Sequence, residues 1–166
     1  MVYVITGGPG FGKTTLLNIL EEKGFRVCPE EARSILDGNS SFPKDFEQRI
    51  ASLRISFLQS TLQEDISFAD RGLPDQIAYS WYKEKRPSTF IEEAVSSKRY
   101  APLVFITPPW QEIYKQDDIR KENFEEACLI HQHITRAYLK YGYQTIDLPF
   151  SSPGMRVEYI LNFLSI

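Results

Sequence analysis

A stretch of glycines and a lysine near the N-terminus has the spacing of a phosphate-binding loop. It is Gly7-Gly8-Pro9-Gly10-Phe11-Gly12-Lys13-Thr14, which fits the pattern G-x-x-x-x-G-K-[ST]. Glycines allow backbone conformations in which successive N–H groups point inward around a phosphate. Lys13 would reach the β- and γ-phosphates of a nucleoside triphosphate, and the Thr14 hydroxyl would bind Mg²⁺. The predicted nucleotide site consists of Gly8, Pro9, Gly10, Phe11, Gly12, Lys13, Thr14 and Thr15.

The loop is flanked by the two elements that its mechanism requires. Val2 to Ile5 is a short apolar run typical of a strand, and Lys13 to Lys23 places its apolar residues at helical spacing. The positive end of such a helix favours a bound anion. The dinucleotide fingerprint G-x-G-x-x-G is excluded, because Lys13 stands where its third glycine should be.

Short apolar strands alternate with longer helices along the rest of the chain. Further strands are predicted at Phe25 to Cys28, Ile66 to Ala69, Leu103 to Ile106 and Tyr143 to Leu148. Helices are predicted at Pro29 to Leu36, Pro43 to Asp65, Pro74 to Lys85, Ser88 to Lys98, Lys121 to Tyr141 and Pro153 to about Phe163. The alternation predicts an α/β fold, a three-layer sandwich with a five-stranded parallel sheet and helices on both faces. The phosphate loop between the first strand and helix makes this a fold of the P-loop NTPase type.

The composition restricts the class of protein. A chain of 166 residues, 42% of them hydrophobic, suits one nucleotide-binding domain spanning 1–166. A net charge of −3 gives no overall field for nucleic acid or an anionic membrane. The sequence has no signal-peptide core, and its two cysteines lack the CxxC spacing of a zinc site. We therefore expect a cytoplasmic monomer or homodimer without nucleic-acid or membrane partners.

Asp70 and Arg71 directly follow the predicted strand Ile66 to Ala69. A carboxylate at this strand end has the place of a Walker B residue, which binds Mg²⁺ directly or through water. Arg71 stands where many motor-type ATPases have the glutamate that activates water, so its presence argues against a hydrolytic machine. An Asp-Arg-Gly turn could also cap the strand and pair its own charges.

Four segments carry a resemblance to known proteins, in order along the chain. They are VITGGPGFGKTT at 4 to 15, VCPEEAR at 27 to 33, FADRGLPD at 68 to 75 and ITPPWQEIYKQDDIR at 106 to 120. The chain resembles the P-loop kinases of nucleosides and nucleotides, and more closely the small predicted AAA-type ATPases grouped with the kinase domain of ribosylnicotinamide kinase. The resemblance implies ATP and Mg²⁺ as cofactors, a small-molecule acceptor, and contact of Arg71 with phosphate or substrate.

The resemblance also implies roles for Glu30 and Arg120. In deoxynucleoside kinases a Pro-Glu pair after the second strand supplies the base for the attacking hydroxyl, and Pro29-Glu30 matches it. Glu30 could instead favour the first turn of a helix. Related kinases carry a lid after the fourth strand, where Arg120 is the candidate for neutralising charge on the transferring group. The predicted catalytic residues are Lys13, Glu30, Asp70, Arg71 and Arg120, and the predicted metal ligands are Thr14 and Asp70.

Two functions remain open at this stage. The first is a kinase that transfers the γ-phosphoryl group of ATP, with Mg²⁺, to a nucleoside-, nucleotide- or vitamin-like acceptor. The second is a nucleotide-binding regulator or weak NTPase that has kept the loop but has no acceptor. The two differ in the role of Glu30, and neither the acceptor nor the choice of ATP over GTP follows from the sequence.

Overall fold

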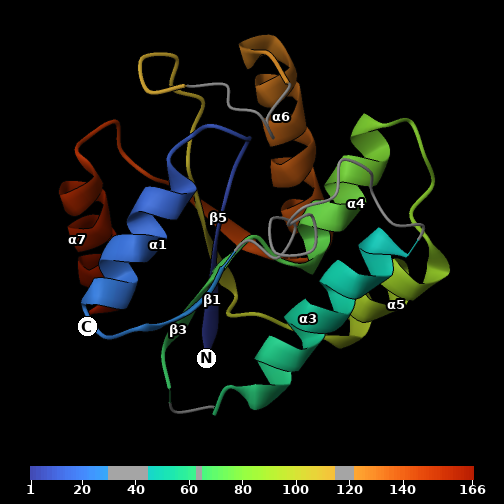
Figure 1. Ribbon diagram of the computed structural model, residues 1–166, viewed down its shortest axis with the longest axis horizontal. Coiled ribbons are helices and arrows are strands. Elements are labelled where there is room, and N and C mark those ends of the chain that lie inside the picture. The colour runs from blue at the N-terminus through green and yellow to red at the C-terminus, as the bar shows by residue number, and fades with distance from the viewer. Residues whose placement is uncertain (30–44, 63–64, 115–121) are drawn as a thin grey trace.

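The computed structural model describes residues 1–29, 45–62, 65–114 and 122–166. It confirms the predicted α/β fold. The strands are β1 (Val2–Thr6), β2 (Arg26–Cys28), β3 (Ser67–Asp70), β4 (Leu103–Ile106) and β5 (Gln144–Asp147). They form one parallel five-stranded sheet in the order β2-β3-β1-β4-β5. The strand that precedes the phosphate loop is therefore the central one (Figure 1).

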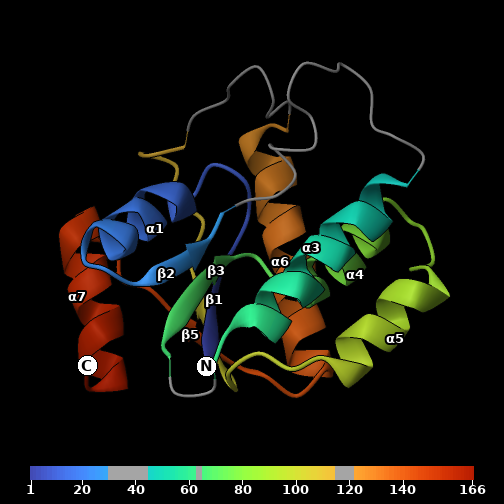
Figure 2. The ribbon, with the colours of Figure 1, turned by 60° about the horizontal axis from the view of Figure 1, so that its bottom comes forward.

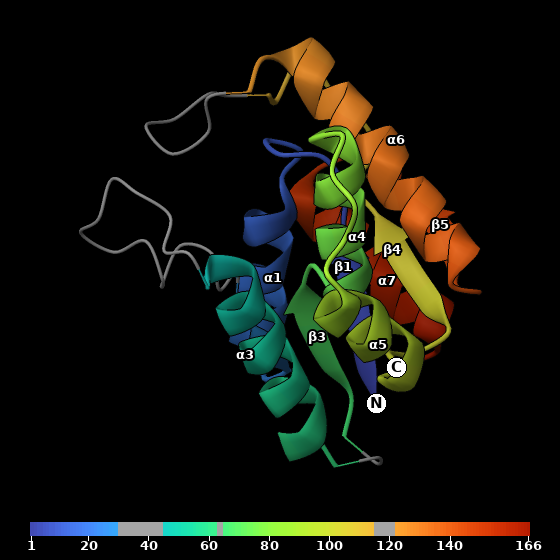
Figure 3. The same cartoon turned by 90° about the vertical axis from the view of Figure 1, so that its right-hand side faces the viewer.

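Helices cover both faces of the sheet. They are α1 (Lys13–Glu22), α3 (Phe46–Ser60), α4 (Leu73–Tyr82), α5 (Thr89–Ser97), α6 (Phe124–Lys140) and α7 (Pro153–Leu164). One face carries α1 and α7, and the other carries the remaining four (Figures 1 and 2). Figure 3 faces this second layer. Among the described residues, no helix has the length and apolar character needed to cross a membrane.

The two cores follow from the alternation of side chains along the buried strands. Val4 and Val104 point to the face covered by α4, α5 and α6, and each is fully buried there. Their chain neighbours Ile5 and Phe105 point to the opposite face and pack against α1 and α7. Because both faces of these strands are covered, their sequences are continuously apolar.

Helix α3 ends earlier than its sequence pattern predicts. The prediction of a helix reaching Asp65 is wrong, because Thr61 adopts an extended conformation with φ −92° and ψ 123°. Arg26 from the start of β2 donates a hydrogen bond of 2.8 Å to the Ser60 carbonyl. A carbonyl at the helix end is thus satisfied by a tertiary contact. The predicted helix Pro29 to Leu36 lies, apart from its first residue, outside the described residues.

The carboxyl ends of β1 and β3 form a topological switch point, where the chain leaves two neighbouring strands toward opposite faces of the sheet. They are neighbours, with Ile5 opposite Asp70. The chain leaves β1 into α1 on one face and leaves β3 into α4 on the other (Figure 2). Ligands of open α/β sheets bind where successive connections diverge in this way. The fold therefore brings the phosphate loop and Asp70 side by side at one edge of the sheet.

A buried carboxylate, Asp75 in the first turn of α4, fixes this end of the sheet. Its Oδ1 accepts hydrogen bonds from Thr6 Oγ1 at 2.5 Å and from Arg71 Nη1 at 3.0 Å. Its Oδ2 accepts from the Gly72 N–H at 2.8 Å and from the Tyr138 hydroxyl at 2.6 Å. One side chain thus joins β1, the turn after β3, α4 and α6.

The electrostatic surroundings keep Asp75 ionised. Burial alone would raise the pKa of its carboxyl, but the positive charges of Arg71 and Arg54 and the hydrogen bonds it accepts lower the pKa below its ordinary value. Burial and the adjacent negative charge of Asp75 raise the pKa of Tyr138 well above its ordinary value. At neutral pH the Tyr138 hydroxyl therefore keeps its proton and donates it in a hydrogen bond to the ionised Asp75 carboxylate.

We expect Asp75→Asn to lower the free energy of unfolding by about 3–5 kcal/mol at neutral pH, because it removes one partner of a buried ion pair. Tyr138→Phe should cost less, about 1.5–3 kcal/mol, since only one bond to the charged group is lost. The measurement is urea-induced unfolding, with the exposed Glu158→Gln as the matched control.

The stability of Asp75→Asn should also depend on pH differently from that of wild type. A folded-state pKa below the unfolded value of about 3.8 gives stability that is present above that value and is lost as the pH falls through the folded-state pKa. Asp75→Asn should therefore lose less stability than wild type on acidification below about pH 4. Identical acid dependence in the two proteins would show that Asp75 is not an ionised, stabilised carboxylate.

Candidate functional site

The phosphate loop begins at a position that only glycine fits. Gly7 has φ +139°, and a β-carbon there would lie 2.3 Å from Thr107 Oγ1 and 2.4 Å from the Thr107 carbonyl oxygen. Thr107, directly after β4, donates its N–H and its hydroxyl to the Thr6 carbonyl at 2.7 and 3.1 Å. The loop therefore leaves β1 in close backbone contact with the neighbouring strand end.

Lys13 lies folded against the loop that precedes it. Its Nζ donates to the carbonyls of Gly8 and Gly7 at 2.8 and 3.2 Å, and its side chain is buried. Thr14 and Thr15 follow at the start of α1 and are exposed. The N-cap is Gly12, which has no side chain to bond the first N–H groups of the helix. These N–H groups and the Lys13 ammonium are donors suited to an anion.

Phe11 anchors the loop to the α6 layer. Its side chain is fully buried, and its ring meets those of Tyr114, Phe124 and His131 edge to face, with centroids 5.9–6.3 Å apart. Burial lowers the pKa of His131, opposed by the charge of Asp147 and reinforced by that of Lys13. The ring of Phe11 thus faces protein, and its contribution to a ligand would come from its backbone N–H.

Asp70 and Arg71 occupy the end of β3 beside the loop. Asp70 is buried, at the strand position opposite Ile5. Arg71 has φ +68°, a left-handed conformation that is uncommon for a residue with a side chain. Its Nη1 donates to the Gly7 carbonyl and to Asp75, both at 3.0 Å, and its guanidinium lies over the Tyr79 ring. Arg71 therefore links the first residue of the loop to α4, and its contact with phosphate or substrate stays a prediction.

Two predicted catalytic residues cannot be placed. Glu30 and Arg120 lie outside the described residues, and their roles remain predictions. At the edge of the site, Trp110 from the segment after β4 meets Phe150 from the segment after β5, with ring centroids 5.4 Å apart. These aromatic rings connect two of the strand-end segments that border the loop.

The sequence reasoning did not single out Asp75 or Arg156. Asp75 stands three residues after Gly72, the N-cap of α4, and its carboxylate accepts the Gly72 N–H, which is the carboxylate half of a capping box. The three-residue spacing between Gly72 and Asp75 is a sequence pattern that could have identified Asp75. Arg156, in the first turns of α7, is almost fully buried, and Nη1 of its guanidinium lies 3.4 Å from where a β-carbon on Gly12 would be. No local pattern predicts this contact.

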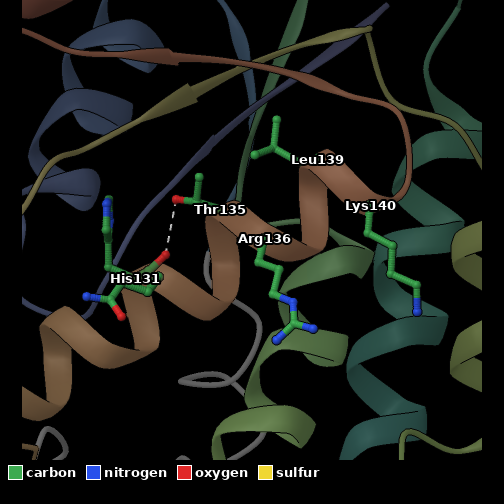
Figure 4. A pocket seen from close by; sticks show the side chains of 6 residues that line it. His131, Thr135, Arg136, Leu139 and Lys140 are labelled. Atoms are coloured by element: carbon green, nitrogen blue, oxygen red, sulfur yellow. Dashed lines mark hydrogen bonds between the residues drawn. The ribbon is translucent and has the colours of Figure 1, made fainter.

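A hollow lies beside α6, and His131, one of its lining residues, also packs against Phe11 of the phosphate loop. The hollow is lined by six side chains of that one helix: His131, Gln132, Thr135, Arg136, Leu139 and Lys140 (Figure 4). A ligand site of an open α/β sheet is instead formed by several strand ends together. We therefore take the loop and its surroundings as the candidate site.

Solved structures of nucleoside and nucleotide kinases share this fold. Thymidylate kinase from Ehrlichia chaffeensis is 16% identical, with a TM-score of 0.65 and 98% of each chain covered. Deoxyadenosine kinase from M. mycoides with bound dATP is 15% identical, with a TM-score of 0.66 and both chains fully covered. The NadR protein in complex with NR is 16% identical with a TM-score of 0.75, and the match covers 99% of this chain and 51% of that one.

The sequence comparisons assign the family. None of the curated proteins compared matches the chain. A family model described as an AAA domain matches residues 2–156, which is most of the chain. That span includes the phosphate loop, the end of β3 and the first turn of α7. The protein belongs to this AAA domain family and is a P-loop nucleotide-binding domain with the fold of nucleoside and nucleotide kinases.

Proposed function

We propose that this protein is a small-molecule kinase that transfers the γ-phosphoryl group of ATP, with Mg²⁺, to a nucleoside-, nucleotide- or vitamin-like acceptor. The observation that carries the proposal is the switch point, where the phosphate loop lies beside the buried Asp70 carboxylate. A loop alone would serve any nucleotide-binding protein. The carboxylate at the neighbouring strand end adds a metal ligand next to the phosphates.

The described residues fit a nucleoside triphosphate and its metal ion. The loop has donors in the Lys13 ammonium and in the first N–H groups of α1, and Gly7 leaves no room for a side chain. Thr14 is exposed and offers its hydroxyl, and Asp70 offers a carboxylate. Mg²⁺ bound by these two oxygens would neutralise charge that develops on the phosphates during transfer.

The transfer step assigns a task to each residue. The acceptor oxygen forms a bond to the γ-phosphorus while the bond from that phosphorus to the β,γ-bridging oxygen breaks, leaving ADP. The hydroxyl proton passes to the Glu30 carboxylate. Lys13 and the loop N–H groups hold the phosphates in line, and Arg120 excludes water and stabilises the moving group. These roles of Glu30 and Arg120 rest on the sequence resemblance.

The named ligands of the similar structures support the choice of substrate class. One deoxyadenosine kinase structure contains dATP, and the NadR structure contains NR. The names thymidylate kinase and deoxyadenosine kinase fit an acceptor class of nucleosides and nucleotides. A nucleotide-binding regulator without an acceptor would also have the phosphate loop. The two functions differ in whether an acceptor is phosphorylated.

Lys13→Ala should weaken ATP binding by roughly 10- to 100-fold, because it removes a charge-assisted contact to the phosphates. Titration calorimetry with ATP and Mg²⁺ measures this change. Lys23→Ala, at the exposed far end of the same helix, is the matched control. Wild-type affinity in folded Lys13→Ala protein would contradict the assignment of the loop.

Asp70→Asn should reduce Mg²⁺-dependent turnover by at least about tenfold more than it weakens ATP affinity, because the metal acts mainly on charge that develops during transfer. Parallel rate and binding measurements over a Mg²⁺ series provide the comparison. Equal turnover of variant and wild type at saturating Mg²⁺ would assign Asp70 a structural role.

Glu30→Gln should retain ATP binding and slow phosphorylation of the acceptor by roughly 10²- to 10⁴-fold, the contribution of a positioned base. Background ATP hydrolysis should change much less. The acceptor is first identified by screening ribosides, nucleotides and vitamins for an ATP-dependent gain in mass. Tight nucleotide binding with no acceptor in the panel would favour the regulator, and equal rates for variant and wild type would exclude Glu30 as the base.

A further inference from the structure

Arg156 brings a buried positive charge to the phosphate loop from the side of α7. Its side chain is only 2% exposed, although arginine is rarely buried without a partner. Nη1 lies 3.4 Å from the position of a β-carbon on Gly12, the last glycine of the loop. Helices α7 and α1 cover the same face of the sheet, which explains the contact (Figure 2).

Within the described part of the chain, the guanidinium has unused donors. Nε and Nη2 of Arg156 are buried and have no hydrogen-bond partner there, and the side chain forms no ion pair with a described carboxylate. Burial lowers the pKa of Arg156. Leaving a charged group buried and unpaired costs several kcal/mol. Packing alone would favour an apolar side chain at this position.

The local backbone does not compensate the charge either. Arg156 lies close to the N-terminus of α7, where the helix dipole is positive, and the first turn of this helix has no acidic residue. The contrast with Arg71 on the other side of the loop is informative, because Arg71 is paired with Asp75. An anion is the partner whose chemistry fits the Arg156 guanidinium.

We propose that Arg156 binds the α-phosphate of the nucleotide held by the phosphate loop. This inference rests on the proposed nucleotide site and adds a ligand-binding residue to it. In the sheet order, the metal ligand Asp70 is on β3 and α7 follows β5, on opposite sides of the central β1. The metal-bound end of a triphosphate would therefore face β3, and the end that carries the nucleoside would face α7 and Arg156.

The binding experiment compares Arg156→Gln with wild type in calorimetric titrations of ATP and of ADP. The expected result is a roughly 10- to 100-fold loss of affinity for both ligands, because each has an α-phosphate. Arg156→Lys keeps the charge and should lose less. The control is Arg136→Gln, an exposed arginine on α6 that should bind like wild type.

The stability experiment separates a ligand-binding role from a structural one. Arg156→Met keeps the apolar stem and removes the unpaired charge, so the melting temperature without nucleotide should stay equal or rise. The increase in melting temperature on adding ATP should shrink, because it depends on affinity. If Arg156 instead has a structural role, Arg156→Met should have a clearly lower melting temperature than wild type without nucleotide. That result would overturn the inference.

The remaining outcomes are distinct. If wild type binds ATP and Arg156→Gln binds it equally well, the inference fails and the proposed function stands. If only ATP affinity falls and ADP affinity does not, the assignment to the α-phosphate is wrong. If folded wild-type protein binds neither nucleotide, both the proposed function and this inference fail.

Discussion

The buried carboxylate of Asp75 is the constraint on which the functional end of this protein depends. Removing a carboxylate from water costs several kcal/mol, and this cost is offset only if its oxygens are fully hydrogen-bonded. Here four donors from β1, the turn after β3 and α6 satisfy it. Because these donors belong to three separate parts of the fold, the carboxylate sets the relative positions of those parts. The carboxyl ends of β1 and β3 are therefore cross-linked by buried hydrogen bonds beside the phosphate loop.

The turn that supplies two of these donors is held in a tight geometry. Arg71 adopts a left-handed conformation, and a β-carbon on the next residue, Gly72, would lie 2.7 Å from the Tyr138 hydroxyl. Such a conformation costs free energy and persists only where the surroundings fix it. The hydrogen bonds of Arg71 to Gly7 and Asp75 provide that restraint, so the strained turn also holds the start of the phosphate loop.

Charge at the loop is distributed unevenly as a result. Toward β3, Arg71 is paired with Asp75. Toward α7, Arg156 has no ion-pair partner among the described residues, and Lys13 is bonded to loop carbonyls. The positive charge directed at a bound phosphate therefore comes from Lys13 and from the α7 side. This asymmetry agrees with the proposed function, in which the acceptor would bind near β3 and the nucleoside part of the nucleotide would bind near β5.

The sequence by itself determined the order of elements, the parallel sheet and the phosphate loop, because these follow from short-range periodicity and from the conformational freedom of glycine. It predicted the end of α3 wrongly, since a tertiary hydrogen bond from Arg26 satisfies that helix end. Only the tertiary structure decided the partners of Asp75, which lie 69 and 63 positions away at Thr6 and Tyr138. The same holds for Arg156, whose burial beside Gly12 depends on α7 packing over the face of α1. Which helix covers which face of a sheet is set by the crossovers of the whole chain, and no local pattern encodes it.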